Sequence, residues 1–179
     1  MIAPAEAGST AHPLLTFVVA TAPGGSRALV DSLASSDPDL YECIVIEAAS
    51  VDELPSNAAA DARGEFVSFV NSGDRVRPDA LLLLRDGLHD TDIDVFYSDE
   101  FVDGQVLRKP EFSPERLRNQ FYWGHFVGYR KTLLDRIGGP NDDFAGARSY
   151  ELALRASREA RTVVHVPGAL LAAGATAAS

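Results

Sequence analysis

Cysteine is almost absent from this chain of 179 residues: Cys43 stands alone, so no disulfide bond can form within the chain. Cys43 lies in the apolar run 41–46, where a free cysteine behaves as a small buried hydrophobic residue. The lack of disulfides favours a reducing compartment, and we expect a cytoplasmic protein. A chain of this length buries enough surface to fold without a covalent or metal crosslink.

Positive charge is also scarce, because 16 Lys and Arg residues face 26 Asp and Glu residues and the formal net charge is −10. Nucleic acids and anionic membranes both attract basic surfaces, so this charge argues against either as a partner. No apolar run reaches the ~18 residues of a membrane span. A phosphorylated ligand would have to be bound by backbone dipoles, a few local cations or a metal ion.

The chain does have enough hydrophobic residues, 46%, for a folded globular domain. We assign a single domain to residues 14–171. Residues 1–13 lack the basic-then-apolar order of a signal peptide and are expected to form a flexible arm. Residues 172–179 contain only Ala, Gly, Thr and Ser and are expected to form a flexible tail.

Apolar runs alternate with helical patterns through the first half of the chain. Strands are predicted at 14–20, 41–46, 65–70 and 93–97, and helices at 26–35, 57–63 and 79–88. This alternation is typical of βαβ units, which build a largely parallel sheet with helices on both faces. The sequence therefore predicts an α/β domain.

The second half is less regular. Asp103-Gly104 predicts a hairpin over 101–107, and Pro167 is expected to end the last strand. The remaining predicted elements are helices at 113–120, 131–137 and 149–157, and strands at 125–130 and 162–166.

Polar residues follow three of the predicted strands, in the segments 47–52, 71–74 and 97–100, and each segment contains at least one carboxylate. Ligands of open α/β sheets bind beyond the carboxyl ends of the strands. Carboxylates gathered there repel one another unless a cation or a ligand rich in donors lies between them. The alternative is that they are solvated turn residues, and spacing alone leaves both interpretations open.

Other catalytic signatures are missing. The chain has no Gly-x-Gly-x-x-Gly, no P-loop and no Gly-x-Ser-x-Gly. Its four histidines show no metal-ligand spacing, and His165 is expected to be a core or edge residue of the last strand.

Several ordered motifs resemble those of inverting family 2 glycosyltransferases of the GT-A fold, between Leu15 and Leu171. The matching segments are Tyr97-Ser98-Asp99-Glu100, Lys109–Glu115, Tyr122–Phe126, Gly138-Gly139, Gly146–Arg155 and Val164–Pro167. The resemblance implies a three-layer α/β/α sandwich with a mostly parallel central sheet. It also implies inverting transfer of a sugar, from a UDP-, GDP- or dTDP-linked donor, to a hydroxyl of a saccharide acceptor in cell-envelope polysaccharide synthesis. Mg²⁺ or Mn²⁺ would assist the leaving diphosphate.

The resemblance also carries roles onto individual residues. Those expected to contact the nucleotide are Glu47, Ser50, Asp52, Asn57 and Arg63. Those expected to hold the metal ion are Asn71 and Asp74. The catalytic candidates are Asp99, Glu100 and Glu151. The candidates for contact with sugar or acceptor are Trp123 and His125. Phe121, Tyr122 and Trp123 could form a platform on which a sugar stacks, although an aromatic cluster is more often part of a core.

Three parts of the family pattern are nevertheless changed. The metal-binding Asp-x-Asp is Asn71-Ser72-Gly73, the catalytic Asp is replaced by Ser149, and the terminal His-Trp-Arg is replaced by residues 172–174, Ala-Ala-Gly. A serine needs its own base to lose a proton, and Ser149 is better suited to cap a helix. Glu151 is two residues along that helix and is expected to face about 200° away.

Two hypotheses follow from these changes. The chain is an active, divergent transferase that uses Asp74, Asp99 or Glu100 as metal ligand or base. Alternatively, it is an inactive binding or scaffolding module, paired with another glycosyltransferase.

Overall fold

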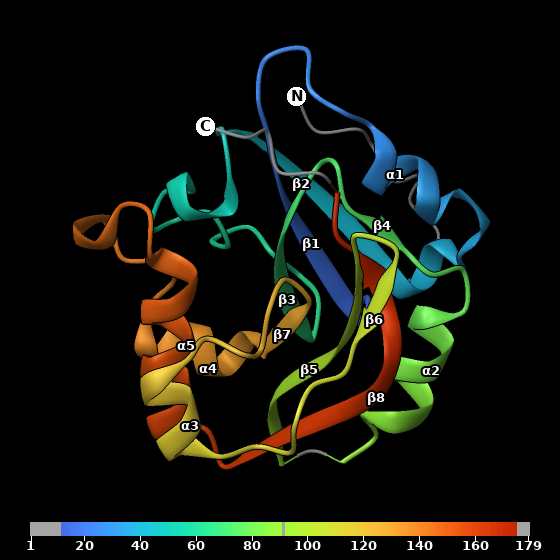
Figure 1. The fold of residues 1–179 in the computed structure, drawn as a ribbon. Helices are drawn as coiled ribbons and strands as arrows, with labels where there is room; N and C mark the ends of the chain where they lie inside the picture. The colour runs from blue at the N-terminus through green and yellow to red at the C-terminus, as the bar shows by residue number, and fades with distance from the viewer. Residues whose placement is uncertain (1–11, 91, 175–179) are drawn as a thin grey trace.

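The computed structural model describes residues 12–90 and 92–174, which form one curled sheet between two layers of helices (Figure 1). The strands are β1 (Leu15–Thr21), β2 (Tyr41–Glu47), β3 (Phe66–Asn71), β4 (Arg75–Val76), β5 (Ile93–Val102), β6 (Gln105–Leu107), β7 (Val127–Arg130) and β8 (Thr162–Ala172). The α-helices are α1 (Ala28–Ser32), α2 (Ala80–Gly87), α3 (Pro114–Asn119), α4 (Lys131–Ile137) and α5 (Arg148–Glu159). Short 3₁₀ helices include η3 (Val51–Glu53) and η4 (Asp142–Phe144).

The strands are ordered β2-β1-β3-β7-β5-β8-β4, with β6 paired to β5. Strand β1 runs parallel to β2 and β3, and β5 runs parallel to β8; these pairings align six to eight residues each. Strand β7 is antiparallel to both β3 and β5 and joins the two parallel blocks. The antiparallel pairings, which also include β4·β8 and β5·β6, align only two or three residues each.

Two hydrophobic cores lie on opposite faces of the sheet, as the three-layer prediction requires. Along β1, Phe17 and Val19 belong to one core, whereas Val18 and Ala20 belong to the other. This alternation follows from the two-residue repeat of a strand, and it explains why β1 is apolar throughout. Helices α1 and α2 cover the first face, and α3, α4 and α5 cover the second (Figure 1).

The predicted helix at 57–63 is wrong. The segment forms successive turns, with i to i+3 hydrogen bonds such as Ala58 N–H to Pro55 O and Ala62 N–H to Ala59 O. The conformation of so short a segment is decided by its tertiary packing rather than by the helix propensity of its alanines. Instead, Ala58, Ala59 and Ala62 pack their small side chains into the core below α5.

Pro167 does not end the last strand, because β8 continues to Ala172. The pairing with β5 shifts at this point, from Ser98 opposite Val166 to Asp99 opposite Ala169. A bulge of this kind leaves Pro167 without a partner carbonyl, so its missing N–H is tolerated.

The end of the described chain is bound to the rest of the fold. Ala172 is the last residue of β8, Ala173 N–H donates to Phe101 O at 2.9 Å, and Gly174 N–H donates to Asp74 Oδ1 at 2.9 Å. The expected tail is therefore ordered over its first three residues, and the rest of it lies outside the described residues, as does most of the expected arm at 1–13. No helix in the described ranges is long and apolar enough to cross a membrane.

Candidate functional site

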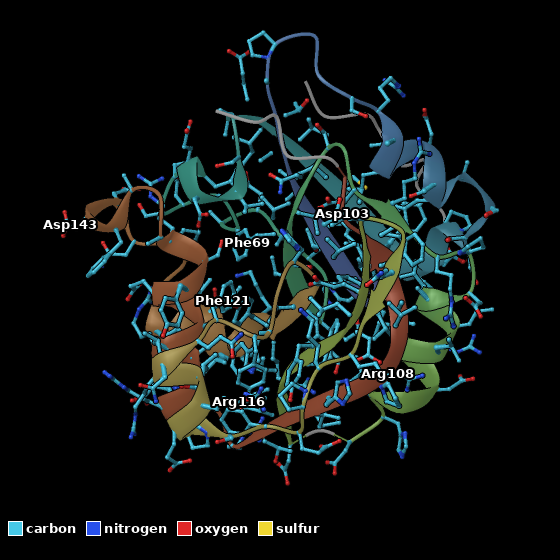
Figure 2. The ribbon with its side chains drawn as sticks, in the orientation of Figure 1. Phe69, Asp103, Arg108, Arg116, Phe121 and Asp143 are labelled. Carbon is cyan, nitrogen blue, oxygen red and sulfur yellow. The ribbon has the colours of Figure 1, made fainter. Side chains whose placement is uncertain are left out.

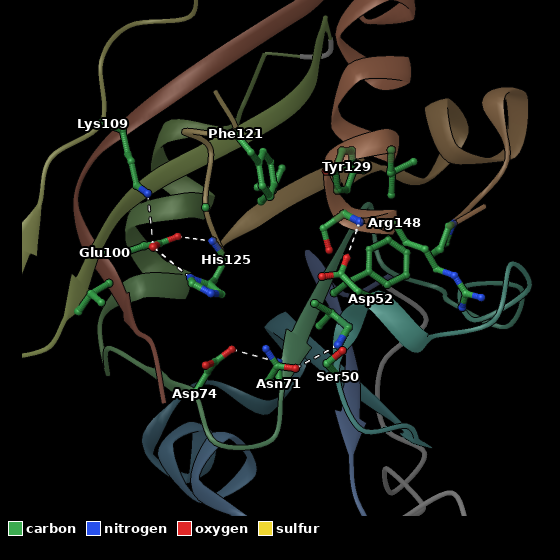
Figure 3. Close-up of a pocket in the computed structure, with 18 of the residues that line it drawn as sticks. Ser50, Asp52, Asn71, Asp74, Glu100, Lys109, Phe121, His125, Tyr129 and Arg148 are labelled. Atoms are coloured by element: carbon green, nitrogen blue, oxygen red, sulfur yellow. Dashed lines mark hydrogen bonds and ion pairs between the residues drawn. The ribbon is translucent and has the colours of Figure 1, made fainter. Parts of the chain in front are cut away.

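A pocket of about 420 Å³ opens where β3 and β5 approach their carboxyl ends, beside η3, the segment before β7 and the start of α5 (Figure 3). Its position agrees with the rule for ligand sites in α/β sheets. The polar residues that line it are Ser50, Asp52, Asn71, Asp74, Glu100, Lys109, His125, Arg148 and Ser149. The segments 47–52, 71–74 and 97–100, which sequence analysis expected to meet, each contribute at least one of these residues.

Glu100 anchors one wall of the pocket and is almost fully buried. It accepts hydrogen bonds from the backbone N–H of His125 and, at 3.3 Å, from that of Phe126. Its Oε2 lies 3.2 Å from His125 Nδ1 and 3.4 Å from Lys109 Nζ. Burial acts to raise the pKa of Glu100, but His125 and the charge of Lys109 outweigh it and lower that pKa. The carboxylate is thus held ionised between cationic partners.

Gly124 makes this arrangement possible. Its backbone has φ of +77°, and a Cβ at this position would lie 2.5 Å from Lys109 Nζ and still closer to Glu100 Oε1. A residue without a side chain is therefore needed where the chain turns over the ion pair. The hydrogen bond to Glu100 raises the pKa of His125 and so favours its protonated form.

The opposite wall carries Asn71 and Asp74, the expected metal ligands. Asn71 Oδ1 accepts Val51 N–H at 3.1 Å, and Asp74 Oδ2 accepts Asn71 N–H at 3.0 Å. Asp74 Oδ1 accepts Gly174 N–H at 2.9 Å. Burial raises the pKa of Asp74, and the nearby charge of Glu100 adds to the increase, although the N–H groups and His125 oppose it. Each of these side-chain oxygens therefore already has a hydrogen-bond donor.

Asp52 lies at the start of α5. Its Oδ1 accepts the backbone N–H of Ser149 at 2.8 Å, so the carboxylate caps the first turn of the helix, where negative charge is stabilised. No hydrogen bond of its Oδ2 is found within the described residues. Ser149 stands where the resemblance placed a catalytic Asp. The carboxylate of Asp52, from η3, lies beside this position. Ser149 itself lies within the helix and does not cap it with its side chain.

The remaining walls are apolar and aromatic, with Phe69, Phe121, Val127, Tyr129 and Leu152 facing the cavity. Figure 2 places Phe69 and Phe121 between the sheet and the layer of α3 and α5, whereas Asp143 projects away from it. Phe69 and Tyr129 are packed together, with ring centroids 6.3 Å apart. Aromatic rings of this kind offer a ligand a large apolar contact area.

Asp99, one of the catalytic candidates, is placed differently. It does not line the pocket, and its carboxylate accepts Lys109 N–H at 2.7 Å and Gly168 N–H at 2.9 Å, with His165 Nε2 at 2.9 Å. Burial works to raise the pKa of Asp99, but these three donors together lower it. Asp99 therefore locks the bulge of β8 onto β5, and His165 is confirmed as a residue of the last strand.

Glu151 and Trp123 also lie outside the pocket lining. Glu151 forms a two-pronged ion pair with Arg155, which donates in turn to the carbonyls of 137–139 and holds the loop after α4. Trp123 is fully buried and stacks on Tyr97, with ring centroids 5.6 Å apart. Its place in the core follows from that packing, and a sugar has no access to it.

Arg63 is at the wrong edge of the sheet for a nucleotide contact. It precedes β3 and pairs with Glu42, near the start of β2, at 2.8 Å. Because β2 and β3 are both parallel to β1, this pair marks the amino edge, away from the pocket. Glu47 and Asn57 have exposed side chains and do not line the pocket, so Ser50 and Asp52 are the expected nucleotide contacts that the structure brings there.

Sequence reasoning did not single out Lys109 and Arg148 for the site. Lys109 lies in one of the matched motifs. The predicted hairpin over 101–107 brings the chain back beside Glu100, and this could have indicated the ion pair of Lys109 and Glu100. Arg148 donates to Leu54 O and lies 3.5 Å from Asp142, contacts that only the folded chain creates.

No protein-family model matches the chain. It is 33% identical to the O-antigen biosynthesis protein RfbC of Myxococcus xanthus over 114 residues, which are 60% of this chain and 9% of that protein. It is 27% identical to the uncharacterized protein y4gI of Sinorhizobium fredii over 130 residues, 68% of this chain and 14% of that protein. The chain thus spans a small part of the curated relatives it matches.

Solved structures show the fold. The 1–349 portion of S. aureus TarS superposes with a TM-score of 0.69 at 18% identity, over 89% of this chain and 60% of that chain. The structure of the same portion of TarS in complex with UDP-GlcNAc gives a TM-score of 0.66 at 16% identity, over 89% of this chain and 58% of that chain. The mannosyltransferase PcManGT of Pyrobaculum calidifontis, in complex with GDP-Man and Mn²⁺, gives a TM-score of 0.62 at 16% identity. This match covers 92% of this chain and 58% of that chain.

The chain therefore has the GT-A fold of glycosyltransferases, as its motifs predicted. Over 114 residues its sequence is also similar to that of the O-antigen biosynthesis protein RfbC.

Proposed function

We propose that this chain is the donor-binding domain of a glycosyltransferase of cell-envelope polysaccharide synthesis. It binds a nucleotide sugar and transfers the sugar to a hydroxyl of a saccharide acceptor. The observation that carries this proposal is the pocket itself, which lies at the carboxyl edge of a GT-A sheet and is lined by aromatic and charged side chains. A pocket of this size suits a small organic ligand with a few charged groups.

The donor class is supported by the structural neighbours. TarS has been solved with UDP-GlcNAc and PcManGT with GDP-Man, and both share this fold. A UDP-, GDP- or dTDP-linked sugar is therefore the donor in our proposal. Ser50 would contact the nucleoside, and Phe121 would border the sugar.

Inverting transfer needs a carboxylate that can take the acceptor's proton. Asp74 and Glu100 use both of their oxygens for N–H donors and cations, whereas Asp52 Oδ2 has no hydrogen bond within the described residues. We therefore assign the base to Asp52. It takes the hydroxyl proton as the acceptor oxygen bonds to the anomeric carbon, and the bond from that carbon to the diphosphate breaks and releases the nucleoside diphosphate.

The test is release of nucleoside diphosphate from UDP-, GDP- and dTDP-linked sugars incubated with the protein and a panel of saccharide acceptors. Acceptor-dependent release from one donor is the expected result. Binding of a donor without any release, for every acceptor, would show an inactive binding module instead. Failure to bind any of the three donor types would contradict the proposal as a whole.

A further inference from the structure

The loop after β3 offers poor ligands to a divalent cation. Hard cations need about six oxygen ligands, with negative charge among them. Asn71 and Asp74 point their side-chain oxygens at the N–H groups of Val51, Asn71 and Gly174, at 2.9–3.1 Å. Within the described ranges, no group of three or more His, Cys, Asp or Glu residues could hold a metal ion. The residues of this pocket do not fit the metal that the fold family implies.

Gly174, the last of the described residues, takes part in this arrangement. Gly174 lies so close to Gly73 that a Cβ on it would be only 2.4 Å from Gly73 O. Two glycines in contact let the backbone N–H of Gly174 reach Asp74. That N–H donates to the Asp74 oxygen that would otherwise be free to bind a cation.

Positive charge enters the pocket from the opposite wall. Lys109 and Glu100 have side chains that are 5% and 1% exposed, and Gly124 leaves the space they need. His125 is the accessible member of the cluster, with 38% of its side chain exposed. Its Nδ1 contacts Glu100, whereas no partner of its Nε2 is found in the part of the chain that the structure describes. The cluster thus presents a hydrogen-bonding ring nitrogen to the cavity, opposite Asn71 and Asp74 (Figure 3).

From this geometry we infer that His125, supported by Lys109 and oriented by Glu100, binds the diphosphate of the nucleotide sugar, and that this binding needs no divalent cation. The inference rests on the proposed function, since it names the group that holds the donor's diphosphate. Within the cluster of Lys109, His125 and Glu100, a protonated His125 leaves one net positive charge, which faces the carboxyl group of Asp74 across the pocket. Charge-assisted hydrogen bonds to phosphate oxygens are the strong ones.

The inference is tested by calorimetric titration of the whole chain with UDP, GDP and dTDP, first in EDTA and then in Mn²⁺. We expect one nucleotide to bind with a dissociation constant that differs less than about threefold between the two conditions. Binding seen only with Mn²⁺ would overturn the inference and leave the proposed function standing. Absence of binding in both conditions would overturn both.

The histidine is tested separately with His125→Gln, which removes the charge and keeps a polar side chain of similar size. In EDTA this variant should weaken nucleotide binding by about tenfold or more, because a charge-assisted hydrogen bond is lost. His89→Gln is the matched control, since His89 is exposed in the loop after α2 and does not line the pocket. Equal affinity for the two variants, with thermal unfolding of both as in the parent, would overturn the role of His125.

Discussion

At the scale of single residues, the site depends on which oxygen atoms still have room for a ligand. Asp52, Asp74 and Glu100 all line the pocket, but the hydrogen bonds around them differ. Glu100 accepts two backbone N–H groups and also contacts two cationic side chains, and Asp74 accepts one N–H on each of its oxygens. Asp52 accepts one N–H through one oxygen. Counting carboxylates in the sequence could not separate these roles, because the donors come from backbone groups that only the fold brings near.

Asp52→Asn tests the assignment of the base. An amide still accepts the N–H of Ser149 but cannot take a proton, so kcat should fall by about 100-fold or more while the dissociation constant of the nucleotide stays within about threefold. Steady-state kinetics and calorimetry give the two quantities. Asp61→Asn, at an exposed turn, is the control. Loss of nucleotide affinity with kcat retained would instead make Asp52 a nucleotide contact.

Gly124→Ala tests the packing over the ion pair of Lys109 and Glu100. The added Cβ meets both charged groups, and the backbone has positive φ, so the free energy of unfolding should fall by more than about 2 kcal/mol. Gly104→Ala is the matched control, because φ is +80° there and no atom lies within 4 Å, so it should lose only about 1 kcal/mol. Urea unfolding measures both, and equal losses would contradict the claim that space over the ion pair matters.

At the scale of elements, the bulge between β5 and β8 links the sheet to the site. Asp99 receives two donors from β8 across this bulge, His165 and Gly168, and the next residue, Glu100, lines the pocket. The pattern of apolar residues predicted both strands but ended β8 at Pro167. A register shift depends on the partner strand, so no local signal in β8 could reveal it. Strand β4 was missed for a similar reason, because two residues show no periodicity.

Because of the donors around Asp99, we predict that the stability of the fold decreases at acidic pH. The pKa of Asp99 is lower in the folded chain than its ordinary value of 3.8, so its contribution is present above about pH 4 and is lost as the pH falls through the folded pKa. The free energy of unfolding of Asp99→Asn should therefore be about 1–3 kcal/mol lower than that of the parent at pH 7. At pH 3 this difference should be smaller. Thermal unfolding of both proteins between pH 7 and pH 3 measures the difference in stability. A difference that does not change with pH would contradict the prediction.

At the scale of the whole molecule, the sequence motifs predicted the three-layer α/β/α fold because they encode packing. Of the residues in these motifs, Tyr97, Trp123 and Leu152 belong to one core, and Phe126 belongs to the other. The motifs predicted the individual site residues less accurately than the fold. Ser50, Asp52, Asn71, Asp74, Glu100 and His125 line the pocket, whereas Arg63, Trp123 and Glu151 were carried over by position in a motif and pair or pack elsewhere.

The central claim is that the pocket binds a nucleoside diphosphate. The most direct test is an NMR titration of the ¹⁵N-labelled chain, whose 19.2 kDa suits amide spectra, with UDP, GDP and dTDP. We predict that one nucleotide shifts the amide signals of Asn71, Gly124, His125 and Ser149, which border the pocket from three segments. Shifts confined to residues away from these segments, or no shifts with any of the three nucleotides, would contradict the claim.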